Sequence, residues 1–258
     1  MNNTIAAFLL GVPFLLLLGL YMGAVFLSNG RHRRWPFYRS VLWGIGTSFA
    51  ILSVAGPLAE RAHVDFTAHM LGHLFLGMLA PLLMALAAPM TLLLRTLPVK
   101  NARRLTKLLR SKPVRVLSNP ITATILNIGG LWLLYATDLY MLMHHSLILH
   151  VFIHIHVFLA GYLFTISILY IDPTPHRHSY LYRGIVLVTA VAGHGILSKY
   201  IYANPPAGIA ADQAQAGGKL MYYGGDMIDA VIIFLLCLHW YQAARPRKNA
   251  AQVTWQNR

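Results

Sequence analysis

Four histidines form two pairs in which the rings are four residues apart, His69 with His73 and His150 with His154. In a helix this spacing places both rings of a pair on the same face. Imidazole nitrogens bind transition metals and haem iron. Each pair lies in a long apolar stretch, where polar side chains are costly and usually functional. The two pairs therefore predict a metal or haem site.

The elements that must position these histidines are helices long enough to cross a bilayer. Hydrophobic residues make up 57% of the chain, charged residues 11%, and the mean hydropathy is +0.57. A spanning helix needs ~20 predominantly apolar residues. We predict an all-α, polytopic membrane protein in which residues 1–258 form a single domain. Its seven transmembrane helices are expected at about 5–27, 38–57, 66–88, 118–137, 147–171, 183–203 and 227–243.

The charge distribution predicts the orientation of this domain. The formal net charge is +14, and all of the 21 Lys and Arg residues except Arg61, Lys199 and Lys219 lie on one side of the predicted helices. The positive-inside rule therefore places the N-terminus outside and the C-terminus inside. Six of the seven acidic residues, Asp229 among them, are expected on or near the outside. The basic stretch 98–115 is expected to rest on anionic lipid rather than nucleic acid, because no nucleic-acid-binding motif accompanies it.

A fifth histidine is predicted to join the two pairs. At 1.5 Å per residue, His69 and His150 lie roughly 5 Å, and His73 and His154 roughly 10 Å, below the outer ends of their helices. His194 lies roughly 13 Å below the outer end of the span 183–203. Metal sites are built by such convergence of segments that are distant in sequence. We expect these five histidines to form one metal site in the outer half of the membrane.

A second group of ligand types is predicted at the outer mouth. Met141, Met143, His144 and His145 lie between two predicted spans, and His63 lies on another loop. Thioether and imidazole together suit copper, especially Cu(I), better than Mg²⁺ or Ca²⁺, which prefer oxygen ligands. The one cysteine of the chain cannot form a thiolate pair. The sequence therefore favours copper as the bound ion and leaves its oxidation state open.

Five segments carry a resemblance to a known family: AHMLGHLFLGMLAPLLMALAAPMTLLLR (68–95), HVFIHIHVFLAGYLFT (150–165), IDPTPHR (171–177), AGHGIL (192–197) and DQAQAGGKLMYYGGD (212–226). In their order and spacing, the chain resembles the seven-helix cytochrome c oxidase assembly factor family, the CtaG type of bacteria with haem–copper oxidases. The likeness covers nearly the whole chain.

The resemblance implies an accessory role in making an active terminal oxidase of the bacterial plasma membrane, by bringing copper to it, with oxidase subunits as partners. It also implies that Asp212, Met221 and Asp226 shape the outer surface from the loop before the last helix, Asp226 lying at that helix's start. Family members commonly carry Met-Trp where this chain has Met221-Tyr222. We expect no enzymatic turnover, because the chain has no nucleophile–base signature, Walker loop, HExxH or Rossmann fingerprint.

Two alternative functions remain open at this stage. Histidines on facing helices at two depths are also typical of a haem-binding membrane cytochrome. A metal transporter is the other alternative, although its ligands should continue across the whole bilayer. Small-residue pairs such as Gly19 and Gly23 permit a homo-oligomer without requiring one.

Overall fold

The computed structural model describes residues 3–245, and within this range the chain is helical and contains no strand. Six helices are long and apolar enough to cross a membrane. A bent pair, Pro120–Ala136 with Leu139–His145, gives a seventh if it counts as one span. The predicted all-α, membrane-spanning fold class is thereby confirmed. Arg247, Lys248 and Arg258, which contribute to the predicted inner charge, lie outside the described residues.

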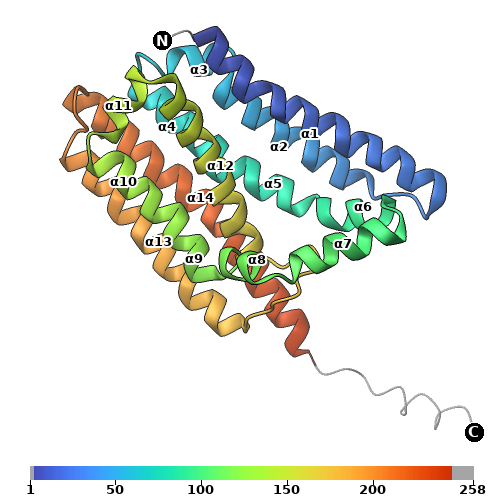
Figure 1. The fold of residues 1–258 in the computed structure, drawn as a ribbon. Coiled ribbons are helices and arrows are strands. Elements are labelled where there is room, and N and C mark those ends of the chain that lie inside the picture. Colours follow the sequence, from blue (N-terminus) through green and yellow to red (C-terminus); the bar gives the residue numbers. More distant parts are fainter. Residues whose placement is uncertain (1–2, 246–258) are drawn as a thin grey trace, which may run out of the picture.

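The helices run back and forth along one bundle (Figure 1). Two of them, η1 and η2, are π-helical turns within longer helices. In chain order the elements are α1 (Asn3–Arg31), α2 (Phe37–Val54), α3 (Pro57–Arg61), α4 (Phe66–Leu74), η1 (Phe75–Leu79), α5 (Ala80–Leu86), α6 (Pro89–Thr96), α7 (Val99–Leu109), α8 (Lys112–Leu117), α9 (Pro120–Thr124), η2 (Ile125–Gly129), α10 (Gly130–Ala136), α11 (Leu139–His145), α12 (Leu147–Ile168), α13 (Tyr180–Ala203) and α14 (Ala211–Ala244).

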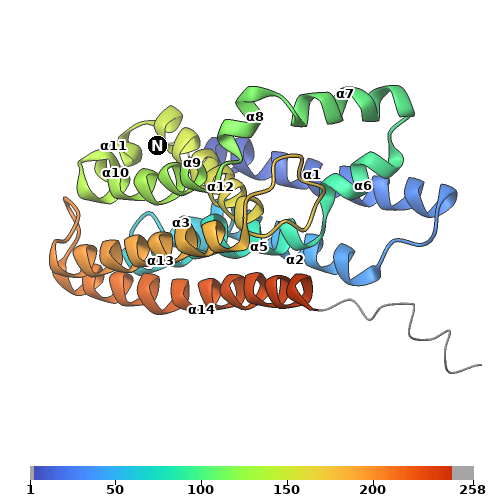
Figure 2. The same ribbon diagram turned by 90° about the horizontal axis from the view of Figure 1, so that it is seen from below.

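The two ends of the bundle differ in their residues. The histidine end comprises the start of α1, α3, the loop 62–65, α11, the start of α12 and the loop 204–210. The basic end comprises the loop 32–36, α6 to α8 and the loop 169–179. Figure 2 shows α7 and α8 on the far side of the bundle from α14.

The last helix differs most from its prediction, because it begins at Ala211 and not near residue 227. Its first half contains glycines and charged residues, which lower the hydropathy and give this segment the composition of a loop. Those glycines instead let neighbouring helices approach: a Cβ on Gly217 would lie 2.7 Å from the ring of Phe66 in α4. Gly218 and Gly225 meet α13 in the same way, at Ser198 and His194. The structure thus replaces a predicted loop with helix–helix contact.

This longer helix corrects two predictions about acidic and methionine residues. Asp212, Met221 and Asp226 lie within α14 and not in a loop before it. The favourable interaction of a carboxylate with the helix dipole is available to Asp212, in the first turn, but not to Asp226 in the interior. Asp229 lies 4% exposed within the bundle and not near the outside.

Two glycines set the distance between the helices that carry the histidine pairs. Pro81 has no N–H, so the carbonyl of Gly77, four residues earlier, receives no α-helical hydrogen bond from it. Gly161 of α12 lies directly on that carbonyl, and a Cβ at Gly161 would overlap it. His150 and His154 precede Gly161 by whole turns, as His69 and His73 precede Gly77. The backbone contact therefore brings His69 and His154 to one level of the bundle, with His150 one turn nearer the histidine end and His73 one turn deeper.

Candidate metal centre

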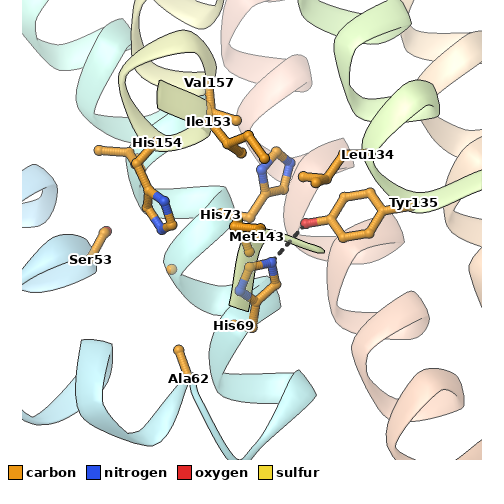
Figure 3. Close-up of a pocket in the computed structure, with 12 residues that line it drawn as sticks. Ser53, Ala62, His69, His73, Leu134, Tyr135, Met143, Ile153, His154 and Val157 are labelled. Carbon is orange, nitrogen blue, oxygen red and sulfur yellow. Dashed lines mark hydrogen bonds between the residues drawn. The ribbon is translucent and has the colours of Figure 1, made fainter. Parts of the chain in front are cut away.

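The two histidine pairs line a pair of adjoining cavities at the histidine end, which we call the histidine chamber. One cavity, of about 200 Å³, is lined by His69, His150 and His154. The other, of about 30 Å³, is lined by His69, His73 and His154 (Figure 3). Both cavities also share Ser53 of α2. All four predicted histidines from α4 and α12 thus meet at one place.

The rings within the chamber are close to one another. The ring centroids of His150 and His154 are 4.1 Å apart, and His63 lies 5.6 Å from His150. His144 of α11 lies 5.9 Å from His63 and 6.4 Å from His69. His63 and His144 also line the larger cavity. The chamber therefore gathers imidazoles from three helices and one loop.

Hydrogen bonds fix part of the orientation of these rings. Nδ1–H of His154 donates to the backbone carbonyl of His150 at 2.8 Å, since a carbonyl can only accept. Its Nε2 therefore carries the lone pair, as in a histidine prepared to bind a metal. Nε2 of His69 lies 3.0 Å from the hydroxyl of Tyr135 in α10 (Figure 3). Such a bond holds a ligating imidazole in place.

Several buried ring nitrogens have no hydrogen-bond partner. Among the histidines they are Nε2 of His73, Nδ1 of His150 and Nε2 of His194 in these cavities, and Nε2 of His176 in the loop 169–179. An unsatisfied buried polar group costs roughly 1–3 kcal/mol, so such groups rarely occur without a reason. Burial also lowers the pKa of His63, in the loop 62–65, which favours its neutral, metal-binding form. The donor set fits a soft cation.

His194 does not line the chamber. Its ring centroid lies 6.4 Å from that of His73. It lines a separate cavity of about 20 Å³, deeper in the bundle, together with Asn127, Thr165 and Asp229. Gly225, which has no side chain, leaves room for the His194 ring beside α14. The five histidines expected in a single site are therefore divided between the chamber and this third, deeper cavity, which the Gly77–Gly161 contact lines.

The predicted residues of the outer mouth divide into two groups. Met143 is fully buried and lines the smaller cavity of the chamber, and His144 lines the larger one. The other five residues line neither cavity. Met141 contacts Gly208, and His145 and Asp212 are exposed. Met221 is buried in an apolar cluster, and Asp226 is half-buried within α14. Only the first group shares a cavity with the paired histidines.

The sequence analysis did not single out three further residues of these cavities as part of the site. Glu60 of α3 lines the larger cavity, Tyr135 binds His69, and Asn127 of η2 lines the deeper cavity with Asp229. An apolar stretch that contains an isolated asparagine or carboxylate is the one signal that indicates the deeper residues. By contrast, His156 of α12 faces η2. Its Nε2 is hydrogen-bonded to the backbone carbonyl of Leu126 at 3.0 Å, which is a structural role.

The side-chain geometry favours pairs of ligands over larger sets. Within residues 3–245, no three His, Cys, Asp or Glu side chains lie close enough together to hold one metal ion. The closest rings, those of His150 and His154, form a pair. A soft ion with few ligands is consistent with this arrangement, whereas a closed structural site of four ligands is not.

The sequence profile of the cytochrome c oxidase caa3 assembly factor family matches residues 19–243. The chain belongs to this family. The match includes all five predicted histidines and most of α14. The family resemblance expected from the sequence is thereby confirmed.

Curated relatives of this family member are uncharacterised mycobacterial proteins. It is 30% identical over 241 residues to proteins of Mycobacterium bovis and Mycobacterium tuberculosis, which covers 83% of this chain and 36% of each relative. A protein of Mycobacterium leprae is 30% identical over 231 residues, covering 80% and 34%. The chain thus spans about a third of the length of these relatives. No solved structure matches it.

Proposed function

We propose that this protein helps to assemble a haem–copper cytochrome c oxidase by binding copper in the histidine chamber and passing it to oxidase subunits. The observation that supports this most directly is that four histidines from α4 and α12 line one chamber. Two of them, His73 and His150, have a buried ring nitrogen without a partner. Family membership adds the link to an oxidase.

The chemistry of the chamber favours copper as cargo. Its ligand types are mainly imidazoles and the thioether of Met143, which favour copper over Mg²⁺ or Ca²⁺, and Glu60 adds one carboxylate to the larger cavity. Within residues 3–245 no Lys or Arg lines either cavity, so no basic side chain there repels a cation. Few ligands per ion allow the ion to be exchanged with a partner. The proposed role therefore needs binding and release but no catalytic turnover.

The proposed orientation follows from the positive-inside rule. The histidine end faces the outside of a bacterial plasma membrane and the basic end faces the cytoplasm. Arg95, Arg103 and Arg110 lie at the basic end, where they repel an emerging cation. This arrangement supports delivery at the outer face over transport across the membrane.

The size of the cavities favours copper over haem. The three cavities lined by the predicted histidines have volumes of about 30, 200 and 20 Å³. Pockets for organic ligands typically have ~300–1,000 Å³.

The test is the copper and haem content of the detergent-purified protein after Cu(I) loading, by elemental analysis together with an absorption spectrum. We expect bound copper and no Soret band in the wild type. His150→Ala/His154→Ala should abolish copper binding. A matched control, His178→Ala/His239→Ala, removes two imidazoles elsewhere and should retain the copper.

The same variants should be examined in the native host at limiting copper. His150→Ala/His154→Ala should lower oxidase activity while the protein still inserts in the membrane. A stoichiometric Soret band would instead establish a cytochrome. Equal copper content in both double variants would show that the chamber is not the binding site.

A further inference from the structure

A groove at the basic end combines cationic and apolar walls. It has a volume of about 720 Å³ and lies between α6 and α7. Its cations are Arg95, Arg103, Lys107 and Arg110, and its apolar wall includes Leu94 and Val99. No aromatic or acidic residue lines it. The groove therefore offers positive charge beside an apolar surface.

The cations of this groove have no counter-charge within the described protein. The sequence contains no Asp or Glu from residue 66 to 137. Asp172, in the loop beside α6, is already engaged: its carboxylate accepts from the backbone N–H of Met90 and Thr91 and from the Thr91 hydroxyl. In the range 3–245, the one ion pair is Arg61–Asp65, at the opposite end. The groove is therefore free to take an external anion.

The walls of the groove are held in place from two sides. The guanidinium of Arg95 donates to the carbonyl of Arg33 at 2.7 Å and lies 5.2 Å from the ring of Trp35. A ring nitrogen of His32 donates to the carbonyl of Arg95 at 3.1 Å. Asp172 binds the start of α6. The loop 32–36 and α6 thus form a fixed wall, against which α7 presents its cations.

The setting of the groove identifies a lipid rather than a soluble anion. Helix α7 runs across the direction of α1 (Figure 1), as expected for a helix that lies along a membrane surface. Val99 and Leu108 of α7 are 67% and 59% exposed, which suits acyl chains better than water. Long Arg and Lys side chains at such a surface reach the headgroup level. Basic pockets at the cytoplasmic ends of helices bind anionic headgroups.

We propose that this groove binds one anionic phospholipid, with its phosphate between Arg95 of α6 and the cations of α7. Arg103, Lys107 and Arg110 recur at helical spacing and present their charges on one face. The acyl chains lie along Leu94 and Val99. This site is independent of the proposed copper chemistry, and it anchors the basic end at one leaflet.

The experiment uses the full chain, purified in detergent doped with phosphatidylglycerol or phosphatidylcholine, and counts retained lipids by native mass spectrometry. The wild type should retain one phosphatidylglycerol and no phosphatidylcholine. Arg103→Gln/Lys107→Gln/Arg110→Gln should bind phosphatidylglycerol roughly a hundredfold more weakly, since three basic contacts are lost. Its thermal unfolding in detergent should match that of the wild type, which shows that the variant is folded.

A control with the same loss of charge distinguishes a site from general attraction. Lys100→Gln/Arg104→Gln/Arg115→Gln removes one Lys and two Arg that do not line the groove and should bind the lipid as the wild type does. Equal weakening in both triple variants overturns the proposal. So does displacement of the lipid by an equal concentration of inorganic phosphate, which would identify a site for free anions.

Discussion

At the histidine end the candidate ligand groups are chiefly imidazoles in enclosed cavities, whereas at the basic end they are cations that face an open groove. His73 and His150 have buried ring nitrogens without a partner, in cavities with no Lys or Arg. Arg103 and Lys107 line a groove with no acidic residue. The first arrangement suits a soft cation and the second an anion.

The two ends also differ in how they are held. At the histidine end, backbone contact between Gly77 and Gly161 sets the distance between the two helices that carry the histidine pairs. A methyl group added at Gly161 is therefore enough to shift those histidines. At the basic end, a side chain holds the short helix α6, because Asp172 binds its first N–H groups. Each end can therefore be perturbed separately. Substitutions at Gly161 and Asp172 test whether helix packing holds the histidine end and a side-chain cap holds the basic end.

The largest effect is expected for Gly161→Ala. Its Cβ would overlap the carbonyl of Gly77, so α12 must move away from η1. We expect a loss of about 3 kcal/mol of stability from overpacking, although alanine favours helix over glycine. Copper binding should fall as the histidine pairs separate, while retention of phosphatidylglycerol at the other end should persist. Thermal unfolding in detergent and the copper content measure the two effects.

Gly19→Ala is the matched control for this substitution. Gly19 is also a helical glycine, but a Cβ there meets nothing within 4 Å. It should leave both the melting temperature and the copper content at or above the wild-type values. If Gly161→Ala behaves like Gly19→Ala, backbone contact does not set the spacing of the histidine pairs.

A smaller effect, confined to the histidine end, is expected for Tyr135→Phe. The substitution removes the hydroxyl that lies 3.0 Å from Nε2 of His69 and keeps the ring. Loss of a partner that orients a metal-bound imidazole typically lowers affinity ~10–100-fold. Competition with a Cu(I) chelator measures this change.

Tyr223→Phe, at a position that is 67% exposed, provides the comparison for the loss of a hydroxyl. It should leave copper affinity unchanged. Equal affinity in wild type and Tyr135→Phe would remove His69 from the proposed ligand set, or would mean that its orientation does not depend on Tyr135.

The histidines at the site were predictable because the signal is local. Two i, i+4 pairs in apolar stretches indicate a helix face, and they carry an energetic cost that a function would explain. Depth along each helix predicted His69 level with His150, whereas His69 and His154 are the histidines that line both cavities of the chamber. The same reasoning predicted His194 near His73, and their ring centroids lie 6.4 Å apart. It could not show that His194 lines a different cavity, because that depends on how α12 meets η1.

The contributions of Tyr135 and α14 could not be predicted in this way. Tyr135 reaches His69 from a helix 66 residues away, and a tyrosine near a helix end is equally typical of a membrane interface. The first half of α14 has low hydropathy because its glycines and charges serve contacts with α4 and α13. Hydropathy detects burial in lipid and misses a helix segment that is built for packing against protein.

The smallest of these effects is expected at the basic end, for Asp172→Ala. Its carboxylate accepts from the N–H groups of Met90 and Thr91 at 3.0 and 2.7 Å, as a capping residue does. Loss of such a cap costs about 1–2 kcal/mol. Thermal unfolding in detergent should show this decrease, and retention of phosphatidylglycerol should weaken because α6 forms one wall of the groove. The copper content should stay that of the wild type.

Asp212→Ala tests whether position or only charge matters. Asp212 is also an acid near a helix start, but it is exposed and lies at the histidine end. It should change stability by no more than about 0.5 kcal/mol, as expected for a surface charge near a helix dipole. A loss of copper in Asp172→Ala would show that the two ends are coupled through the bundle. The two ends would then not be held independently, one by helix packing and the other by a side-chain cap.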